Sequence, residues 1–339
     1  MDKITLVITS INKPNDVIKK FYNVCKEKNI QFLIIGDRKT PSYRLKYPLI
    51  SIEKQRKLTF KLARSLPENS YSRKNLGYLL AMKNCSNIIV ETDDDNYPLK
   101  NFFHNLLIKK KLKSIKGDEW INIYSLFSKS NEKIWPRGFP LDEINKKNII
   151  NIKEKTVFSP IQQRMCDGNP DVDAIYRLTK KFKFVNFKKA LNFSIENNSL
   201  CPFNSQNTVW HLESFPLLYL PSFCSMRATD IWRGFVALRV MKCYNWKLSF
   251  LETTAVQNRN VHNLLNDFNQ EYEVYRDTKL FNNILKKVEL SKKKKDILVN
   301  IFKCYEALVK NKILDIKELD LVFAWLEDIW SFFQNLQKV

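Results

Sequence analysis

Three consecutive aspartates stand where an apolar stretch of the sequence ends. Residues 87–90 read Asn-Ile-Ile-Val, and Asp93, Asp94 and Asp95 follow after two further residues. Because side chains alternate along extended backbone, Asp93 and Asp95 are expected to project to one side and Asp94 elsewhere. Carboxylate oxygens so placed can share a hard divalent cation, as in a metal-diphosphate site. A solvated acidic loop is the alternative, because short motifs give many false positives.

Glycine is scarce, and its positions single out further segments. The chain has only six glycines in 339 residues, so each is expected where no side chain fits. Five of them fall within polar or aromatic clusters, at Gly36, Gly77, Gly138, Gly168 and Gly234. Gly77 lies inside a predicted helix, which indicates close approach of that helix to a neighbour or a ligand.

Charge and cysteine usage limit the classes of protein to consider. The formal net charge is +22, and lysine runs occur at residues 109–111 and 292–295. This charge fits a solvated lysine-rich surface or peripheral contact with an anionic membrane or glycan. Nucleic acid is not expected as a partner, because no known nucleic-acid motif is present. Seven scattered cysteines without a CxxC pair, and the lack of a signal peptide or transmembrane span, predict a cytoplasmic protein.

The predicted elements alternate between strand and helix at the start of the chain. Strands are expected at residues 4–9, 31–35 and 87–90, and helices at 14–28 and 72–83. This order predicts a parallel sheet of the nucleotide-binding kind. Beyond about residue 263 the pattern becomes helical. There an apolar stripe is predicted to form a core face, and it comprises Leu319, Val322, Phe323, Leu326, Ile329, Trp330 and Phe333.

Several strings of the sequence together resemble a known family. They are Leu76-Gly77-Tyr78-Leu79, Glu91-Thr92-Asp93-Asp94-Asp95-Asn96, Trp135–Leu141, Asp167–Leu178, Pro202–Thr208 and Asp230–Gly234. The chain resembles the GT-A glycosyltransferases and, in these strings, the STELLO-like glycosyltransferase family. It is more distantly similar to the reversibly glycosylated, UDP-arabinopyranose mutase-like proteins.

The resemblance implies an α/β fold with a GT-A-like mixed sheet flanked by helices and a helical C-terminal appendage. We expect a glycosyltransferase domain over residues 1–270, with a nucleotide-binding half (1–100) and an acceptor half (101–270). Residues 271–339 form the expected helical region.

The cation and the leaving diphosphate have candidate ligands in this scheme. Asp93 and Asp95 would hold Mn²⁺ or Mg²⁺, and His262 is the candidate for a further metal or phosphate contact. A capped loop histidine is the alternative for His262. Arg259 could bind the diphosphate by a bidentate contact.

The nucleotide is expected at the ends of the first two strands. Thr9, Asn12 and Asp37 are candidates there, and Asp94 is assigned to the same group. A turn residue is the alternative for Asp37. The phosphates are expected near the start of the 72–83 helix, where Arg73 and Lys74 supply positive charge.

An inverting transfer needs a general base on the acceptor side. Asp230 is the favoured candidate, although a helix N-cap is a competing interpretation. Asp171 and Asp173 are the other candidates for the base or for contacts with sugar hydroxyls.

The sequence therefore predicts a cytoplasmic, metal-dependent glycosyltransferase that moves a hexosyl or pentosyl group from a nucleotide sugar, with UDP favoured, to a glycan or glycolipid acceptor. A nucleotide-sugar mutase and a non-catalytic glycan- or nucleotide-binding protein are the alternatives.

Overall fold

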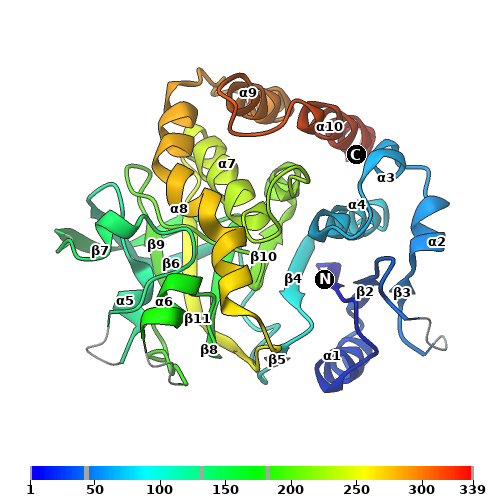
Figure 1. Ribbon diagram of the computed structural model, residues 1–339, viewed down its shortest axis with the longest axis horizontal. Coiled ribbons are helices and arrows are strands. Elements are labelled where there is room, and N and C mark those ends of the chain that lie inside the picture. Colours follow the sequence, from blue (N-terminus) through cyan, green and yellow to red (C-terminus); the bar gives the residue numbers. More distant parts are fainter. Residues whose placement is uncertain (1, 42–45, 130–132, 148, 181–183, 337–339) are drawn as a thin grey trace.

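The computed structural model describes residues 2–41, 46–129, 133–147, 149–180 and 184–336, with the backbone alone for 333–336. Within these residues one sheet of eleven strands runs through the molecule, with helices packed on it (Figure 1). The strands are β1 (Ile4–Thr9), β2 (Gln31–Ile35), β3 (Leu49–Ile50), β4 (Ile88–Asp93), β5 (Asn96–Pro98), β6 (Lys109–Gly117), β7 (Ile150–Phe158), β8 (Ile161–Gly168), β9 (Phe193–Ile195), β10 (Asn207–His211) and β11 (Leu248–Gln257). The α-helices are α1 (Asp16–Glu27), α2 (Ile52–Arg56), α3 (Lys61–Ser65), α4 (Lys74–Lys83), α5 (Ile123–Phe127), α6 (Ala174–Thr179), α7 (Thr229–Cys243), α8 (Leu264–Lys287), α9 (Ile297–Lys310) and α10 (Lys317–Leu336).

The sheet is mixed. Its strand order is β3-β2-β1-β4-β10-β8-β11-β9-β6-β7, and β5 pairs with β11. The strands β3, β2, β1 and β4 are parallel, whereas β10 is antiparallel to both of its neighbours, β4 and β8. The predicted fold class, a mixed sheet flanked by helices with a helical C-terminal region, is confirmed.

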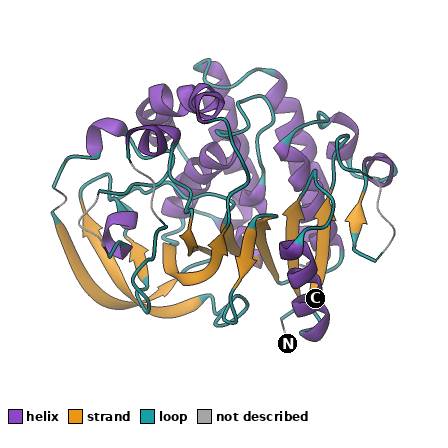
Figure 2. Ribbon diagram, turned by 60° about the horizontal axis from the view of Figure 1, so that its bottom comes forward, coloured by secondary structure: helices purple, strands orange, loops and turns teal. Residues whose placement is uncertain are grey.

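Alternate residues of the parallel strands enter two different cores. Val7 and Ile89 join the larger core, to which α4, α7, α8, α9 and α10 contribute. Leu6 and Val90 face the other way and pack with Phe21 of α1. Figure 2 shows the strands as one curved layer with most helices on one side of it. This burial on both faces explains why β1, β2 and β4 read as continuous apolar runs.

The first strands begin and end where the sequence predicts them. β1 and β2 coincide with the predicted ranges, and the predicted helix over 72–83 is a 3₁₀ turn (Tyr71–Arg73) followed by α4. A Cβ atom on Gly77 would lie 2.5 Å from Cγ1 of Val7. The close approach expected of Gly77 is therefore confirmed, and its neighbour is the sheet.

The C-terminal helices connect the two halves of the sheet layer. α9 packs on α7 and α8, and α10 packs on α3 and α4 (Figure 1). Asp328 of α10 accepts hydrogen bonds from the backbone N–H groups of Lys61 and Leu62, at 2.8 and 2.9 Å. The predicted domain boundary at residue 270 falls inside α8, and the division into domains stays a prediction.

The apolar stripe of α10 is only in part a core face. Val322 and Ile329 are fully buried, but Phe323 is 56% exposed and Trp330 is 52% exposed. The prediction was wrong for these two residues, because the buried face of α10 is narrower than the apolar stripe. The side chain of Phe333, the last residue of the predicted stripe, lies outside the described residues. Among the described residues, no helix is both long enough and apolar enough to cross a membrane.

Candidate active site

The carboxyl ends of β1, β2 and β4 open onto a cavity of 790 Å³, called the main cavity below. Ligands collect at this edge of α/β sheets, because the strand ends and the loops that follow them are free to meet a substrate there. Eleven of the predicted site residues line it, namely Thr9, Asn12, Asp37, Arg73, Asp93, Asp94, Asp95, Asp171, Asp230, Arg259 and His262. The other two, Lys74 and Asp173, do not line it.

The three aspartates form a turn, which we call the acidic turn (Asp93, Asp94 and Asp95). β4 ends at Asp93, and Asp94 and Asp95 turn the chain into β5. The predicted extended course through Asp95 was therefore wrong. The chain must turn here because Asn96 pairs with Gln257 of β11 and does not continue alongside β1.

Asp94 fastens the acidic turn to the loop after β1. Its Oδ2 accepts hydrogen bonds from Ser10 Oγ at 2.5 Å and Asn12 Nδ2 at 3.1 Å. Its backbone carbonyl accepts a further bond from Asn15 Nδ2 at 2.7 Å. Asp94 thus positions Asn12 on the cavity wall, and it lines the same cavity as Asp93 and Asp95.

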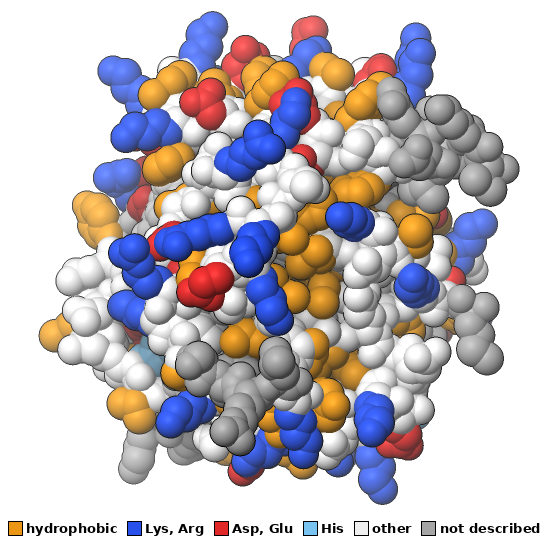
Figure 3. Space-filling view, turned by 90° about the vertical axis from the view of Figure 1, so that its right-hand side faces the viewer, with side chains coloured by type: hydrophobic (Ala, Val, Ile, Leu, Met, Phe, Trp, Pro, Cys, Tyr) orange, Lys and Arg blue, Asp and Glu red, His pale blue; other side chains and the backbone are white. Residues whose placement is uncertain are grey.

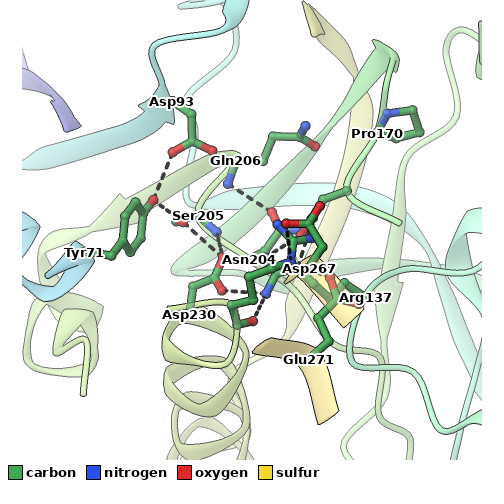
Figure 4. A network of polar contacts seen from close by, with 12 residues as sticks. Tyr71, Asp93, Arg137, Pro170, Asn204, Ser205, Gln206, Asp230, Asp267 and Glu271 are labelled. Atoms are coloured by element: carbon green, nitrogen blue, oxygen red, sulfur yellow. Dashed lines mark hydrogen bonds and ion pairs between the residues drawn. The ribbon is translucent and has the colours of Figure 1, made fainter. Parts of the chain in front are cut away.

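Asp93 lies within a polar network inside the main cavity. Tyr71 donates its hydroxyl to Asp93 Oδ1 at 2.9 Å and lies 2.6 Å from Ser205 Oγ (Figure 4). Lys74 Nζ donates to the Tyr71 hydroxyl at 2.9 Å and to the Thr92 carbonyl at 3.0 Å. Burial raises the pKa of Asp93 to about 6, against the opposing charge of Lys74.

Lys74 was predicted to face the phosphates, but it does not line the cavity. Its side chain is fully buried, with Nζ 3.6 Å from Asp93 Oδ1 and 3.8 Å from Glu91 Oε2. Because a 3₁₀ turn precedes α4, Lys74 is directed toward β4. We infer that it offsets part of the negative charge on β4.

Asp95 has a carboxylate oxygen without a partner. Its Oδ2 accepts a hydrogen bond from Gln257 Nε2 at 2.9 Å, whereas its Oδ1 is buried and accepts none from the described residues. Burial and the charge of Asp93 raise the pKa of Asp95 to about 7. A buried anionic oxygen without a donor is costly, and a cation would satisfy it.

The residues of the acidic turn fit a small cation site with open positions. No group of three or more His, Cys, Asp or Glu side chains in the described part of the chain is arranged to hold a metal ion. Mg²⁺ is often held by one or two carboxylates, with substrate phosphates and water completing its shell. Asp93 and Asp95 match that arrangement, because both carboxylates face one cavity that has room for a diphosphate.

His262 and Arg259 lie on a different part of the cavity wall. His262 Nδ1 is 3.2 Å from Asp267 Oδ1, and Arg259 donates to Asp267 Oδ2 at 2.5 Å. Asp267 thus fixes both side chains next to the start of α8. The structure does not group His262 with Asp93 and Asp95, and its role as a metal ligand stays a prediction.

Asp37 and Arg73 line the cavity but also hold its loops. Asp37 accepts hydrogen bonds from the backbone N–H groups of Asn69 and Ser70, at 2.8 and 2.9 Å. Arg73 donates to Gln55 Oε1 at 2.6 Å, and burial lowers its pKa. The turn-forming interpretation of Asp37 therefore applies, and a carboxylate so placed can still accept from a ligand.

An arginine cluster, made of Arg137, Asp171 and Asp230, also lines the main cavity. The Arg137 guanidinium donates to both oxygens of Asp171, at 3.0 and 2.7 Å, and to both oxygens of Asp230, at 3.0 and 3.1 Å. Burial acts against ionisation of Asp230, but the Arg137 charge outweighs it and holds the Asp230 pKa well below its usual range. Both carboxylates are thus internally paired.

Asp230 is not the helix cap that its position suggested. The N-cap of α7 is Ala228, which makes no side-chain capping bond, and Asp230 lies within the first turn. Its Oδ2 accepts from the backbone N–H and the hydroxyl of Ser205, each at 3.1 Å (Figure 4). The competing N-cap interpretation was wrong, and the general-base role remains a prediction.

Asp173 is a structural residue in this arrangement. It is the N-cap of α6 and accepts from the Tyr176 N–H at 2.7 Å and from Trp135 Nε1 at 2.6 Å. Its side chain is fully buried, and burial raises its pKa to about 7. Asp173 does not line the cavity, because one of its oxygens caps α6 and the other accepts from the Trp135 indole.

Sequence reasoning left many cavity residues without an assigned role, among them Arg137, Gln206 and Arg227. Arg137 and Gln206 stood within the strings that carry the family resemblance. Gln206 has a buried Oε1 without a partner among the described residues. Arg227 lies outside those strings, and its Nε donates to Glu271 at 2.5 Å. In the sequence, only its position close to Asp230 indicates that Arg227 could belong to the site.

Other residues of those strings support the site from beneath. Glu91 is fully buried and accepts hydrogen bonds from Trp210 Nε1 at 2.8 Å, Arg233 at 2.7 and 3.1 Å, and the Tyr78 hydroxyl. Strings that are far apart in the sequence therefore meet at one buried carboxylate. This network fixes β4, α4 and α7 relative to one another.

Comparison with known proteins gives these strings a family context. Residues 227–338 match the family model of STELLO glycosyltransferases. The chain is 29% identical over 268 residues to the probable glycosyltransferase STELLO2 of Arabidopsis thaliana, an alignment that covers 71% of this chain and 34% of that protein. The STELLO-like resemblance is confirmed. Probable glycosyltransferase STELLO1 of the same plant is 28% identical to this chain, with 71% of this chain and 33% of that protein covered. The chain thus spans about a third of the length of these curated relatives.

Solved structures with a related arrangement are more distant. Glucosyl-3-phosphoglycerate synthase from Mycobacterium tuberculosis, in complex with phosphoglyceric acid, aligns at 12% identity and a TM-score of 0.45, covering 83% of this chain and 80% of that one. A mycobacterial protein aligns at 10% identity and the same TM-score, with 83% and 74% covered.

Proposed function

We propose that this STELLO-like chain is a metal-dependent glycosyltransferase that transfers a hexosyl or pentosyl group from a nucleotide sugar, with UDP as the favoured nucleotide, to a glycan or glycolipid acceptor. One observation supports this function most directly. Asp93 and Asp95 share a cavity at the carboxyl ends of β1, β2 and β4, and Asp95 Oδ1 is buried without a partner among the described residues.

The two carboxylates would hold Mn²⁺ or Mg²⁺, which neutralises the charge that develops on the leaving diphosphate. Asp93 and Asp95 supply hard oxygen ligands, and the hydroxyl of Tyr71 keeps Asp93 oriented. The cation would bind the unpartnered Oδ1 of Asp95 and would offset the negative charge of the diphosphate.

The nucleoside would lie along the ends of β1 and β2. Thr9, Asn12 and Asp37 line that part of the cavity. Asn12 is held by Asp94, so its side chain is set before the donor arrives, which lowers the entropy lost on binding. Arg73 and Arg259 would face the phosphates, where a guanidinium donates two hydrogen bonds.

The sugar and the acceptor would meet near the arginine cluster. Arg137 keeps Asp171 and Asp230 in place by paired hydrogen bonds. It also keeps Asp230 ionised, although the same pairing weakens this carboxylate as a proton acceptor. We assign Asp230 as the base that takes the acceptor's hydroxyl proton, with Asp171 binding sugar hydroxyls.

The enzyme would work in the cytoplasm, with peripheral contact to an anionic membrane surface. Support comes from the net charge of +22. Lysine and arginine side chains are spread over the face that carries β3 and α2 (Figure 3).

A turnover screen tests the function. Purified protein is mixed with a panel of nucleotide sugars and a panel of glycan and glycolipid acceptors, with Mn²⁺, with Mg²⁺ or with EDTA, and release of the nucleotide is measured. We expect release from a UDP-sugar only with the divalent cation. An isomerised nucleotide sugar without nucleotide release would favour the mutase. Binding of UDP without turnover of any donor would favour the non-catalytic alternative.

A further inference from the structure

A second cavity, called the basic cavity below, lies where the sheet opens between β6 and β11. The short strand β9 separates these two strands, with Phe193 paired to both Lys113 and Phe250. Beyond Phe193, residues 109–112 of β6 and 251–254 of β11 have no strand between them among the described residues. A cavity of 280 Å³ lies there.

The wall of the basic cavity is strongly positive. Four cationic residues line it, namely Lys109, Lys110, Lys111 and Arg164, and Glu252 is the acidic residue among them. Lys111 pairs with Glu154 at 3.0 Å. Within the described ranges no carboxylate lies within 4 Å of the Lys110 ammonium or of the Arg164 guanidinium.

The two central cations are buried. Lys110 is 8% exposed and Arg164 is 3% exposed. Burial without an ion-pair partner is unfavourable for a charged side chain, because it loses its hydration. Burial and the nearby Arg164 charge together lower the pKa of Lys110 to about 7, and the charge of Glu252 opposes this shift. A bound anion would favour the charged form of Lys110.

Backbone carbonyls orient these cations but do not neutralise them. Arg164 donates to the carbonyls of Phe102, His104 and Asn105, at 3.0, 2.7 and 3.1 Å. Lys110 Nζ donates to the Asn105 carbonyl at 2.5 Å. Arg164 Nε is buried and has no hydrogen-bond partner among the described residues. The charge of the guanidinium is therefore not offset by an acidic partner among the described residues.

We propose that the basic cavity binds the phosphate group of a small phosphorylated molecule, with Lys110 and Arg164 as the principal contacts and Lys109 at the rim. A doubly charged phosphate suits this wall better than a singly charged carboxylate, because the lining carries an excess of positive charge. This assignment is independent of the proposed transfer reaction, since no residue of the basic cavity lines the main cavity.

The test uses inorganic phosphate as the probe in a buffer with EDTA, at an ionic strength held constant with chloride. Binding is measured by isothermal titration calorimetry for the parent protein, Lys110→Gln and Lys113→Gln. Lys113 is an exposed lysine of the same strand that does not line the cavity, so it controls for the loss of one charge. We expect phosphate to bind the parent and Lys113→Gln alike, and to bind Lys110→Gln about tenfold or more weakly, the size of one charged hydrogen bond.

Equal binding by the two variants, or no binding by the parent, would overturn the proposal. If Lys110→Gln does not fold, Lys109→Gln takes its place, because Lys109 is exposed at the cavity rim. Phosphate should then bind severalfold more weakly than to Lys113→Gln.

A second pair of arms identifies the source of the phosphate. Ribose 5-phosphate is compared with vesicles of phosphatidic acid in phosphatidylcholine. If Lys110→Gln weakens binding of ribose 5-phosphate, the ligand is a soluble phosphate compound. If it weakens binding of the vesicles alone, the ligand is a lipid headgroup. Binding of both probes unaffected by Lys110→Gln contradicts the site.

Discussion

The acidic turn and the arginine cluster line the same cavity and are linked through Tyr71 and Ser205, but their carboxylates are in opposite electrostatic states. Asp171 and Asp230 each receive two hydrogen bonds from Arg137, and Asp230 is held ionised. Asp95 has one buried oxygen without a partner among the described residues, and burial raises its pKa to about 7. The arginine cluster is complete without a ligand, whereas the acidic turn is completed by a cation.

The basic cavity, like the acidic turn, contains a buried charged group without an ion-pair partner among the described residues, but its charge is positive. Burial raises the pKa of Asp95 and lowers that of Lys110, each to about 7. Both sites border β11, where Thr254 lines the basic cavity and Gln257 the main cavity. An unpaired buried charge thus marks a place where each site can take a ligand of the opposite sign.

Asp230→Asn gives the largest expected effect on turnover. The substitution removes the proton acceptor but keeps the size of the side chain, so kcat should fall by about two to four orders of magnitude while the donor KM changes little. Stability should also fall, because Arg137 loses one charged partner. Steady-state kinetics with a UDP-sugar measures the effect. Activity within a few-fold of the parent would make Asp230 a partner of Arg137 only, and the base would be sought at Asp171.

Arg137→Gln tests the internal pairing of the arginine cluster. The change leaves two buried carboxylates without their counter-ion, so the free energy of unfolding should fall by about 3 to 5 kcal/mol. Urea unfolding measures this free energy. Lys19→Gln is the control, because Lys19 pairs with Asp16 where both side chains are exposed and such pairs contribute little to stability. Similar losses for the two variants would show that the cluster is not specially stabilising.

His211→Gln tests the lowered pKa of a buried histidine near the basic cavity. Burial, then the charges of Lys110 and Arg164, lower the His211 pKa from 6.5 to about 4. The folded protein therefore favours the neutral ring, and stability is lost as pH falls from 6.5 to 4, by up to about 3 kcal/mol from this group. Urea unfolding between pH 7 and 4 should show a shallower decline for His211→Gln. Parallel pH profiles for variant and parent would contradict the shift.

Much of the site could be predicted because it follows from strand ends. Thr9, Asp37 and Asp93 each stand at or just after a buried apolar run, and parallel strands bring such positions to one edge. The sequence resemblance added Asp171 and Asp230, which line the same cavity. The roles of these residues stay predictions.

The remaining features depend on contacts between distant segments. Arg137 lies 93 residues from Asp230 in the sequence, and no local pattern connects them. The turn at Asp94 and Asp95 arises from pairing of β5 with β11, which the local apolar pattern does not reveal. Lys74 faces β4 because a 3₁₀ turn sets the start of α4, and Phe323 is exposed because α10 buries only part of its apolar stripe.

Calorimetric titration of UDP, with and without Mn²⁺, tests the role of the acidic turn most directly. It compares the parent with Asp95→Asn and with Asp16→Asn, an exposed aspartate of α1 outside the cavity. We predict that Mn²⁺ strengthens UDP binding in the parent and in Asp16→Asn but not in Asp95→Asn. Without the cation, Asp95→Asn should melt no lower than the parent, because a buried unpartnered charge has been removed. UDP binding to Asp95→Asn in Mn²⁺ as tight as to the parent would contradict the account.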